Sequence, residues 1–165
     1  MKENPIIEYL KQLAGMSWAP DQKGFYVERA KRAREVNCVP LEDAFSQDVV
    51  ERIRWAYRAE IRQCYKNAAD LVILLGHTEK VSYVEGYVLS CGIPIEHAFV
   101  RVGDKYVDPT FELALHENVR GHTYVSCYEF EPVKMAKYLI KTKQYGNLSQ
   151  YDFLKRTRPA LAAKW

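Results

Sequence analysis

Long apolar runs are missing from this sequence of 165 residues. A helix that crosses a membrane needs at least about 18 consecutive apolar residues, and no stretch of the chain approaches that length. Residues 1–18 also lack the apolar core, about 7–15 residues long, that a secretory signal peptide contains. We therefore expect a cytoplasmic protein without a membrane partner.

Sequence motifs for phosphate and metal binding are missing too. Neither G-x-x-x-x-G-K nor G-x-G-x-x-G occurs, which excludes the common glycine-rich phosphate loops. The chain has four cysteines but no Cys-x-x-Cys pair, which excludes a zinc ribbon. Nothing points to an oxidising compartment, so we interpret all four as reduced thiols. They are Cys38, Cys64, Cys91 and Cys127. We expect no metal and no cofactor.

A strong excess of one charge is also missing, because 24 Lys and Arg stand against 21 Asp and Glu. The resulting net charge of +3 does not by itself indicate a nucleic-acid partner, and we expect none. Two short basic runs, Arg29–Arg34 and Lys155–Arg158, are typical of a solvated helix face and a solvated tail. They leave a nucleic acid or an acidic partner as an alternative.

The chain does contain enough apolar material for one core. Hydrophobic residues make up 48% and charged residues 27%, which excludes a disordered chain. A length of 165 residues corresponds to one domain. We predict a single domain over 1–165, with a helical N-terminal part (1–46), a core (47–130) and a helical C-terminal part (131–165).

Helical spacing of apolar residues occurs at 1–14, 25–36, 47–75 and 132–141. Pro20 and Gly24 indicate a loop at 16–24. The segment 47–75 is much longer than the average helix of about 11–12 residues, so we predict a break near Glu60–Gln63.

β-branched and aromatic residues predict strands at 82–90, 95–102, 105–108 and 123–130. Helices come first and an antiparallel meander follows. This order predicts an α+β fold in which helices pack on a small antiparallel β-sheet.

The turn at Gly103-Asp104 sets the register of the second hairpin. A two-residue loop there places Phe99 opposite Asp108. His97 and Asp108 then share a face as diagonal neighbours, with backbones about 7–8 Å apart. A carboxylate in that position can hold the imidazole in one tautomer and stabilise its charged form. A three-residue loop would shift the register and separate the pair.

Cys64 is the candidate nucleophile for this pair. If a helix begins at Cys64, its thiol lies at a helix N-terminus and can be activated by a neighbouring histidine. If the helix instead runs unbroken from Gln47, Cys64 lies in its middle and gains nothing from the helix dipole.

Cys64, the strand His97-Ala98-Phe99 and the run Asp108-Pro109-Thr110 carry a family resemblance. Over about residues 60–112, the chain resembles the transglutaminase-like branch of the papain-like cysteine enzyme superfamily, and it is similar to small uncharacterised proteins of bacteria and phages. The resemblance implies a papain-like core with Cys64 as nucleophile, His97 as base and Asp108 as orienting carboxylate. The chain departs from the pattern at Phe99, where Trp is usual, and no Gly or Trp flanks Cys64.

Three neighbouring residues are secondary candidates. Gln63 can donate to an oxyanion beside the Cys64 backbone N–H, as side-chain amides do in papain-like sites, or its side chain can point away. Glu85 is a candidate second acceptor behind the site, or an ordinary strand residue. If the first hairpin has a four-residue loop, Gly86 lies opposite His97 and leaves room for the helix that carries Cys64.

The resemblance implies a cysteine-dependent enzyme that acts on an amide bond through a thioester, as a hydrolase or an acyl transferase. Its substrates would be peptides, proteins or small amides. The same family contains inactive members, so the alternative is a catalytically silent scaffold that binds a peptide, a small ligand or a host protein. Two other interpretations stay open: a structural His–Asp pair with an ordinary cysteine, and a zinc site with an unusual ligand set. The sequence does not indicate an oligomeric state.

Overall fold

The computed structural model describes residues 3–165. Its helices are α1 (Pro5–Gly15), α2 (Pro20–Arg32), α3 (Leu41–Ala44), α4 (Gln47–Ala56), α5 (Cys64–Leu75), α6 (Pro132–Thr142), α7 (Leu148–Thr157) and α8 (Pro159–Ala162). Its strands are β1 (Arg34–Val36), β2 (Val81–Ser90), β3 (Ile93–Val102), β4 (Lys105–Val107) and β5 (Thr123–Phe130). A π-helix, η1 (Thr110–Ala114), and a 3₁₀ turn, η2 (Val119–Gly121), connect β4 to β5.

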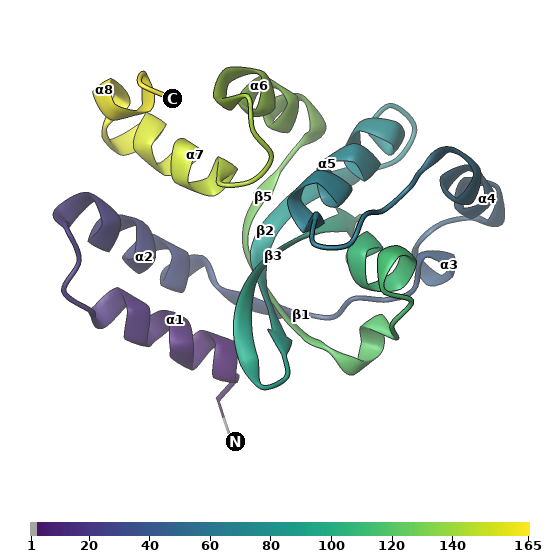
Figure 1. Ribbon diagram of the computed structural model, residues 1–165, viewed down its shortest axis with the longest axis horizontal. Coiled ribbons are helices and arrows are strands. Elements are labelled where there is room, and N and C mark those ends of the chain that lie inside the picture. The colour runs from purple at the N-terminus through teal and green to yellow at the C-terminus, as the bar shows by residue number, and fades with distance from the viewer. Residues whose placement is uncertain (1–2) are drawn as a thin grey trace.

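The five strands form one antiparallel sheet in the order β1-β5-β2-β3-β4. The sheet is strongly curled and lies in the middle of the molecule (Figure 1). Helices α1 and α2 form a pair on one side of it, α5 packs along β2 and β3, and α6 to α8 lie above the sheet in Figure 1. This arrangement confirms the predicted α+β fold.

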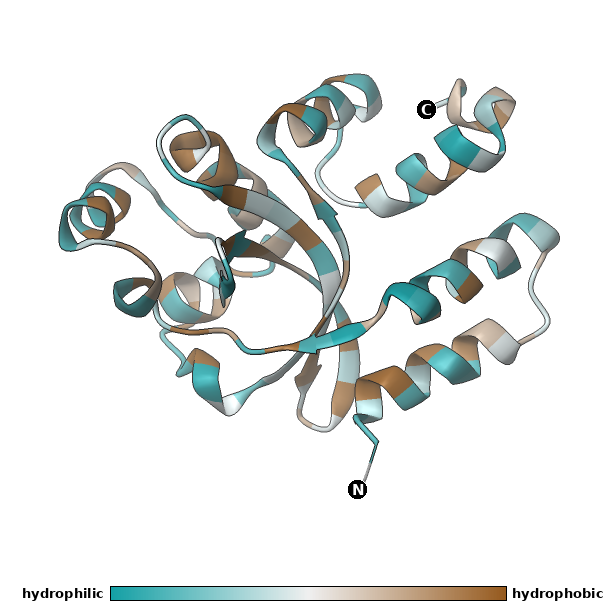
Figure 2. Cartoon of the chain, turned by 180° about the vertical axis from the view of Figure 1, so that it is seen from behind, coloured by the Kyte–Doolittle hydropathy of each residue, from teal (hydrophilic) through white to brown (hydrophobic). Residues whose placement is uncertain are grey.

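Two apolar clusters fill the two faces of the sheet. Side chains alternate along β2, so Tyr83 and Tyr87 face the larger cluster while Val84 and Val88 face the smaller one. The larger cluster includes the buried face of α5, and this helix is hydrophobic along most of its length (Figure 2). Among residues 3–165, no helix combines the length and the apolar composition needed to cross a membrane.

The start of α5 is fixed by a polar contact behind it. Helix α4 ends at Ala56, and a loop with a left-handed residue, Arg62 (φ 64°), leads to Cys64. Asn67 holds this loop, because its Oδ1 accepts from Glu60 N at 2.9 Å and its Nδ2 donates to Glu60 O at 2.8 Å. The chain therefore has the predicted break, and Cys64 is the first residue of the new helix.

Both hairpins have two-residue turns. The first turns at Cys91 (φ 49°) and Gly92 (φ 78°), so β3 begins earlier than predicted, and Gly86 lies opposite His97. The second turns at Gly103-Asp104, as the sequence predicted. β4 ends one residue before Asp108, which leaves this carboxylate beyond the last strand pair.

Gly86 does not make room for the helix that carries Cys64. A Cβ at this position would lie 2.0 Å from the Val125 carbonyl oxygen, at the point where the β2–β5 register shifts. The backbone of β5 takes the space instead. This position therefore needs glycine because two strands approach each other closely.

The N-terminal part differs from the prediction in two places. The loop predicted at 16–24 is shorter, because α2 begins at Pro20, and Gly24 inside α2 makes room for Phe153, whose Cζ would lie 3.0 Å from an added Cβ. Arg34–Val36, predicted as helix, forms β1 because it pairs with β5. The helix predicted at 1–14 is present as α1, and residues 1–2 of that prediction lie outside the described residues.

Candidate active site

The structure brings His97 and Asp108 into direct contact. His97 lies in the middle of β3, and Asp108 follows β4. Asp108 Oδ2 accepts from Nε2 of His97 at 2.7 Å. The exposed fraction is 4% for His97 and 0% for Asp108, so water does not compete for this hydrogen bond.

Three further donors hold the Asp108 carboxylate. The Tyr124 hydroxyl donates to Oδ2 at 2.9 Å. The backbone N–H groups of Thr110 and Phe111 donate to Oδ1 at 3.0 and 3.2 Å, and they form the first turn of η1. All four donors together satisfy a carboxylate that is out of reach of solvent. They also fix its orientation toward His97.

Cys64 completes the group from the first turn of α5. Its thiol lies close enough to the His97 ring to raise the pKa of that histidine. Because Nε2 of His97 binds Asp108, the ring nitrogen left for the thiol is Nδ1. Cys64 is partly exposed, unlike the two residues behind it. The three side chains therefore form a chain from the surface inward: thiol, imidazole, carboxylate.

The charge state of His97 is set by its two neighbours. Burial alone lowers the pKa of His97, but the charge and hydrogen bond of Asp108, together with Cys64, raise it to about 10. The imidazolium is therefore favoured at neutral pH. Phe99 and Phe111 enclose the ring, at centroid distances of 6.3 and 5.3 Å, and keep water away from it.

Gln63 occupies the position immediately before α5. Its side chain is exposed and caps no backbone N–H of the helix. The backbone N–H of Cys64 belongs to the first helical turn, whose N–H groups have no acceptor within the helix. The Cys64 backbone N–H is therefore available to an oxyanion beside the thiol, whereas no hydrogen bond in the described structure holds the Gln63 side chain toward that position.

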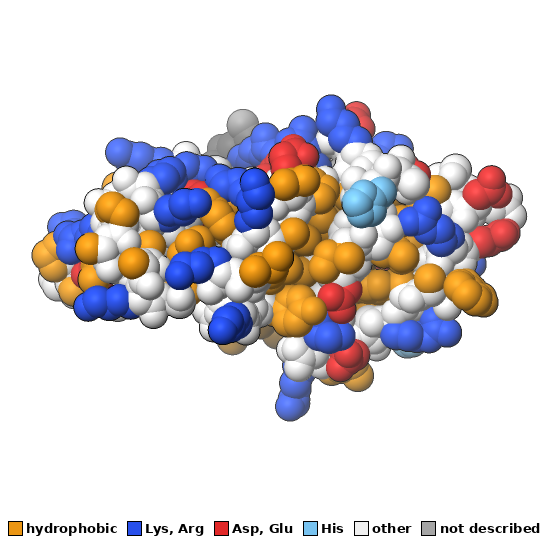
Figure 3. Space-filling model, turned by 90° about the horizontal axis from the view of Figure 1, so that it is seen from above, with side chains coloured by type: hydrophobic (Ala, Val, Ile, Leu, Met, Phe, Trp, Pro, Cys, Tyr) orange, Lys and Arg blue, Asp and Glu red, His pale blue; other side chains and the backbone are white. Residues whose placement is uncertain are grey.

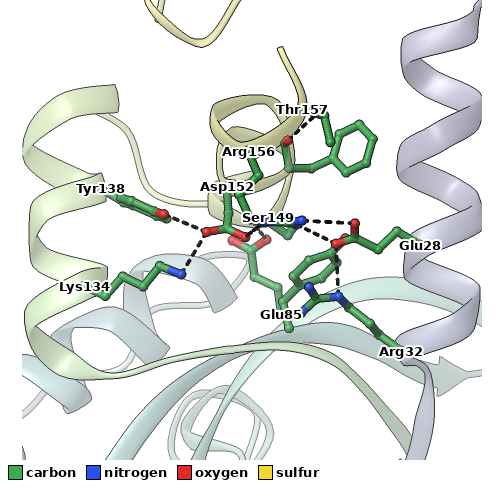
Figure 4. A network of polar contacts seen from close by, with 11 residues as sticks. Glu28, Arg32, Glu85, Lys134, Tyr138, Ser149, Asp152, Arg156 and Thr157 are labelled. Atoms are coloured by element: carbon green, nitrogen blue, oxygen red, sulfur yellow. Dashed lines mark hydrogen bonds and ion pairs between the residues drawn. The ribbon is translucent and has the colours of Figure 1, made fainter. Parts of the chain in front are cut away.

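Glu85 lies on the other face of β2 and holds a different element. Its two carboxylate oxygens accept from the backbone N–H groups of Leu148 and Ser149, both at 2.9 Å. The Tyr83 hydroxyl donates to it as well, at 2.9 Å. Figure 4 shows Glu85 directly below Ser149. The carboxylate therefore anchors the N-terminus of α7, a role that the sequence interpretation of Glu85 missed.

Two positioning contacts were not predicted from the sequence. Tyr124 reaches Asp108 from β5, and nothing in the strand pattern distinguishes it from other aromatic residues there. Asn67 Nδ2 also donates to Thr110 Oγ1 at 3.0 Å, which ties α5 to η1. The second contact connects the helix that begins at Cys64 to the segment that follows Asp108.

The zinc interpretation has no support in the described part of the chain. No group of three or more His, Cys, Asp or Glu residues between residues 3 and 165 is arranged to hold a metal ion.

Comparison of the chain with protein-family models, with curated proteins and with solved structures found no match. The resemblance to the transglutaminase-like branch therefore remains an expectation based on the residues themselves.

Proposed function

We propose that this protein is a cysteine-dependent enzyme that acts on amide bonds of peptides, proteins or small amides, as a hydrolase or an acyl transferase. One observation carries the proposal. The His97 ring lies between the Cys64 thiol and a buried Asp108 carboxylate, with 2.7 Å between Nε2 and Oδ2. Nucleophile, base and orienting group stand in the order that acyl transfer through a thiol requires.

The first half of the reaction forms a thioester. At neutral pH His97 is already the imidazolium, so Nδ1 holds the proton that the Cys64 thiol gives up in the resting pair, and the Cys64 thiolate attacks the carbonyl carbon of the amide. The developing oxyanion is stabilised by the Cys64 backbone N–H, and we propose that the exposed Gln63 side chain turns to donate a second hydrogen bond. As the carbon–nitrogen bond breaks, the imidazolium returns its proton to the leaving amine.

The second half releases the acyl group. Water or an amine enters, His97 takes one of its protons, and attack on the thioester expels the Cys64 thiolate. Water gives a carboxylic acid, and an amine gives a new amide. Asp108 holds the ring in the same orientation in both halves through its hydrogen bond to Nε2.

Alkylation by iodoacetamide tests the thiol–imidazole pair. Cys91 is the matched control because it is the more exposed thiol and has no histidine partner in the described structure. At about pH 6, where an ordinary thiol is protonated, we expect Cys64 to react faster than Cys91 despite its lower exposure. The His97→Ala variant should lose this preference. Equal rates at Cys64 and Cys91 in the wild type would contradict the proposal.

A second measurement separates an enzyme from a silent scaffold. The wild type is incubated with peptide and small-amide libraries, and intact mass spectrometry detects an acyl group on the protein. A covalent adduct that the Cys64→Ala variant does not form supports the enzyme. Ligand binding without a covalent adduct or turnover would support the alternative, a catalytically silent scaffold in which Cys64, His97 and Asp108 are arranged as in an enzyme.

A further inference from the structure

The positive charge of the chain is concentrated in its C-terminal part. Residues 132–165 contain eight Lys and Arg but only one acid, Asp152. Residues 1–131 contain 16 Lys and Arg against 20 Asp and Glu, so their net charge is −4. A charge asymmetry of this size between two parts of one chain indicates an anionic partner for the basic part.

Helices α6, α7 and α8 expose these cations and bury the acid. All eight Lys and Arg residues are exposed, whereas Asp152 is 4% exposed. Asp152 is also fully engaged, because it binds Lys134 Nζ at 2.9 Å, Arg156 Nε at 3.0 Å and the Tyr138 hydroxyl at 2.6 Å (Figure 4). Within residues 3–165, six of the eight cations make no ion pair: Lys137, Lys141, Lys143, Lys155, Arg158 and Lys164.

Three of the lysines form one face of α6. Lys134, Lys137 and Lys141 are spaced at i, i+3 and i+7, so their side chains lie on the same side of the helix. This side borders α7, because Lys134 pairs with Asp152 of that helix. The distance from Lys134 to Lys141 along the helix axis is about 10–11 Å.

Helix α7 adds two further cations beside this face. Lys155 Nζ lies 5.3 Å from the centre of the Tyr138 ring, and Lys134 Nζ lies 5.4 Å from the same centre. Arg156 meets Lys134 at Asp152 and also pairs with Glu28 of α2 at 2.6 Å. These five cations are called the basic surface below: Lys134, Lys137, Lys141, Lys155 and Arg156. Figure 3 shows Lys and Arg side chains gathered over the left half of the upper face, where α7 and α8 lie, with few acidic side chains among them.

The centre of the basic surface is charged, and its apolar neighbours lie at the border. The side chain between the lysines is Tyr138, which is only 6% exposed. The exposed apolar side chains of α6, Val133 and Ile140, lie beyond Lys137 on the helix surface. Protein interfaces and membrane-bound helices have the opposite order, with apolar side chains at the centre of the contact. A nucleic acid needs no apolar centre, because its phosphates alone supply non-specific binding.

We infer that the basic surface binds the phosphate backbone of a double-stranded nucleic acid, without reading its bases. A duplex carries one phosphate per about 1.7 Å of its axis, so the length from Lys134 to Lys141 spans about six phosphates. Single strands bind by stacking their bases on exposed aromatic rings, and the Tyr138 ring is covered. The inference does not depend on chemistry at Cys64.

The test uses a fluorescein-labelled DNA duplex of about 24 base pairs and mixed sequence, which is longer than the basic surface. Fluorescence anisotropy with the full chain should show saturable binding at about 50 mM NaCl. The logarithm of the affinity should fall with the logarithm of the salt concentration with a slope of about −3 to −4.5, as three to five phosphate contacts predict. No saturable binding up to about 100 μM protein, or binding that salt does not weaken, would overturn the inference.

Two double variants locate the binding. Lys137→Gln with Lys141→Gln should weaken duplex binding at least about tenfold and make the salt slope less negative by about 2. Arg54→Gln with Arg62→Gln is the matched control, because it removes the same charge from exposed positions on α4 and the loop after it (Figure 1). That control should bind the duplex within about twofold of the wild type. All four side chains are exposed, so circular dichroism should show an unchanged fold. Equal effects of the two double variants would mean that only the overall charge matters and would overturn the inference.

Two further probes distinguish the possible anionic partners. Phosphatidylserine vesicles and polyglutamate are titrated under the same conditions as the duplex, and each should bind more weakly than the duplex. Tighter binding to either probe, lost in the variant Lys137→Gln with Lys141→Gln, would replace the nucleic acid by a membrane surface or an acidic protein segment. That result would overturn the inference while keeping the basic surface as the binding site.

Discussion

The Tyr124 hydroxyl donates to Oδ2 of Asp108 at 2.9 Å, and this is the same oxygen that binds His97. The tyrosine comes from β5, so the site depends on a strand that carries none of the three principal residues. Burial and the charge of Asp108 both raise the pKa of Tyr124, which keeps its hydroxyl a donor at any physiological pH. The carboxylate is therefore held between two donors that approach from different strands.

Removal of this hydroxyl should destabilise the protein and loosen the site. Tyr124→Phe deletes a buried hydrogen bond to a carboxylate, so we expect a loss of about 1.5–3 kcal/mol in the free energy of unfolding, measured in urea. We also expect slower alkylation of Cys64 at about pH 6, because His97 is less firmly held. Tyr145→Phe is the control, since Tyr145 is half exposed and donates to a surface carboxylate. An equal, small effect of both variants would contradict the positioning role.

Part of the geometry of the site can be predicted from local patterns in the sequence. The two-residue turn at Gly103-Asp104 sets the register, and register alone makes His97 and Asp108 diagonal neighbours. The break before Cys64 was predictable because one helix of that length is rare in a small domain. Both inferences use residues close together in the sequence.

Other features depend on contacts between distant parts of the chain. Glu85 looks like a site residue because it lies near His97 in the strand pattern, yet its partners come from α7, more than 60 residues later. β1 is extended because β5 is available beside it, although its own sequence continues a helical pattern. Tyr124 comes from β5 and Asp108 follows β4, two strands that are not neighbours in the sheet. No local pattern contains this information.

The stability of the protein should depend on pH through His97. The pKa of His97 is about 10 in the folded protein, above its ordinary value of 6.5, so the protonated ring stabilises the fold. This contribution is complete below about pH 6.5 and is lost as the pH rises through about 10. We expect the free energy of unfolding of the wild type, relative to that of His97→Gln, to fall across this window.

The comparison is repeated in a Cys64→Ala background, which removes the neighbouring thiol. Asp108 alone still raises the pKa of His97, so the same direction is expected with a smaller change. Urea unfolding at a series of pH values measures the free energy of unfolding of both pairs. The first pair is the wild type and His97→Gln, and the second is Cys64→Ala with and without His97→Gln. A difference that stays constant, or that grows with pH, would show that His97 is not protonated in the folded protein.

Glu85→Gln tests whether Glu85 serves the fold or the site. Glutamine keeps one acceptor for α7 but removes the charge and the second acceptor. We expect a loss of about 1–3 kcal/mol in the free energy of unfolding and an unchanged rate of Cys64 alkylation at about pH 6. Glu8→Gln, at an exposed position of α1, should change neither quantity. A large fall in Cys64 reactivity without loss of stability would show instead that Glu85 serves the active site.

Gly86→Ala tests the close approach of β2 and β5 behind His97. An added Cβ would lie 2.0 Å from the Val125 oxygen, and the atom it meets is backbone, so the strands must separate. We expect a loss of about 3 kcal/mol or more in the free energy of unfolding, at the upper end of overpacking effects. Gly121→Ala is the matched control, because no atom lies within 4 Å of its added Cβ. That variant should lie within about 1 kcal/mol of the wild type. Equal stability of the two variants would mean that β5 can move away from Gly86 without cost.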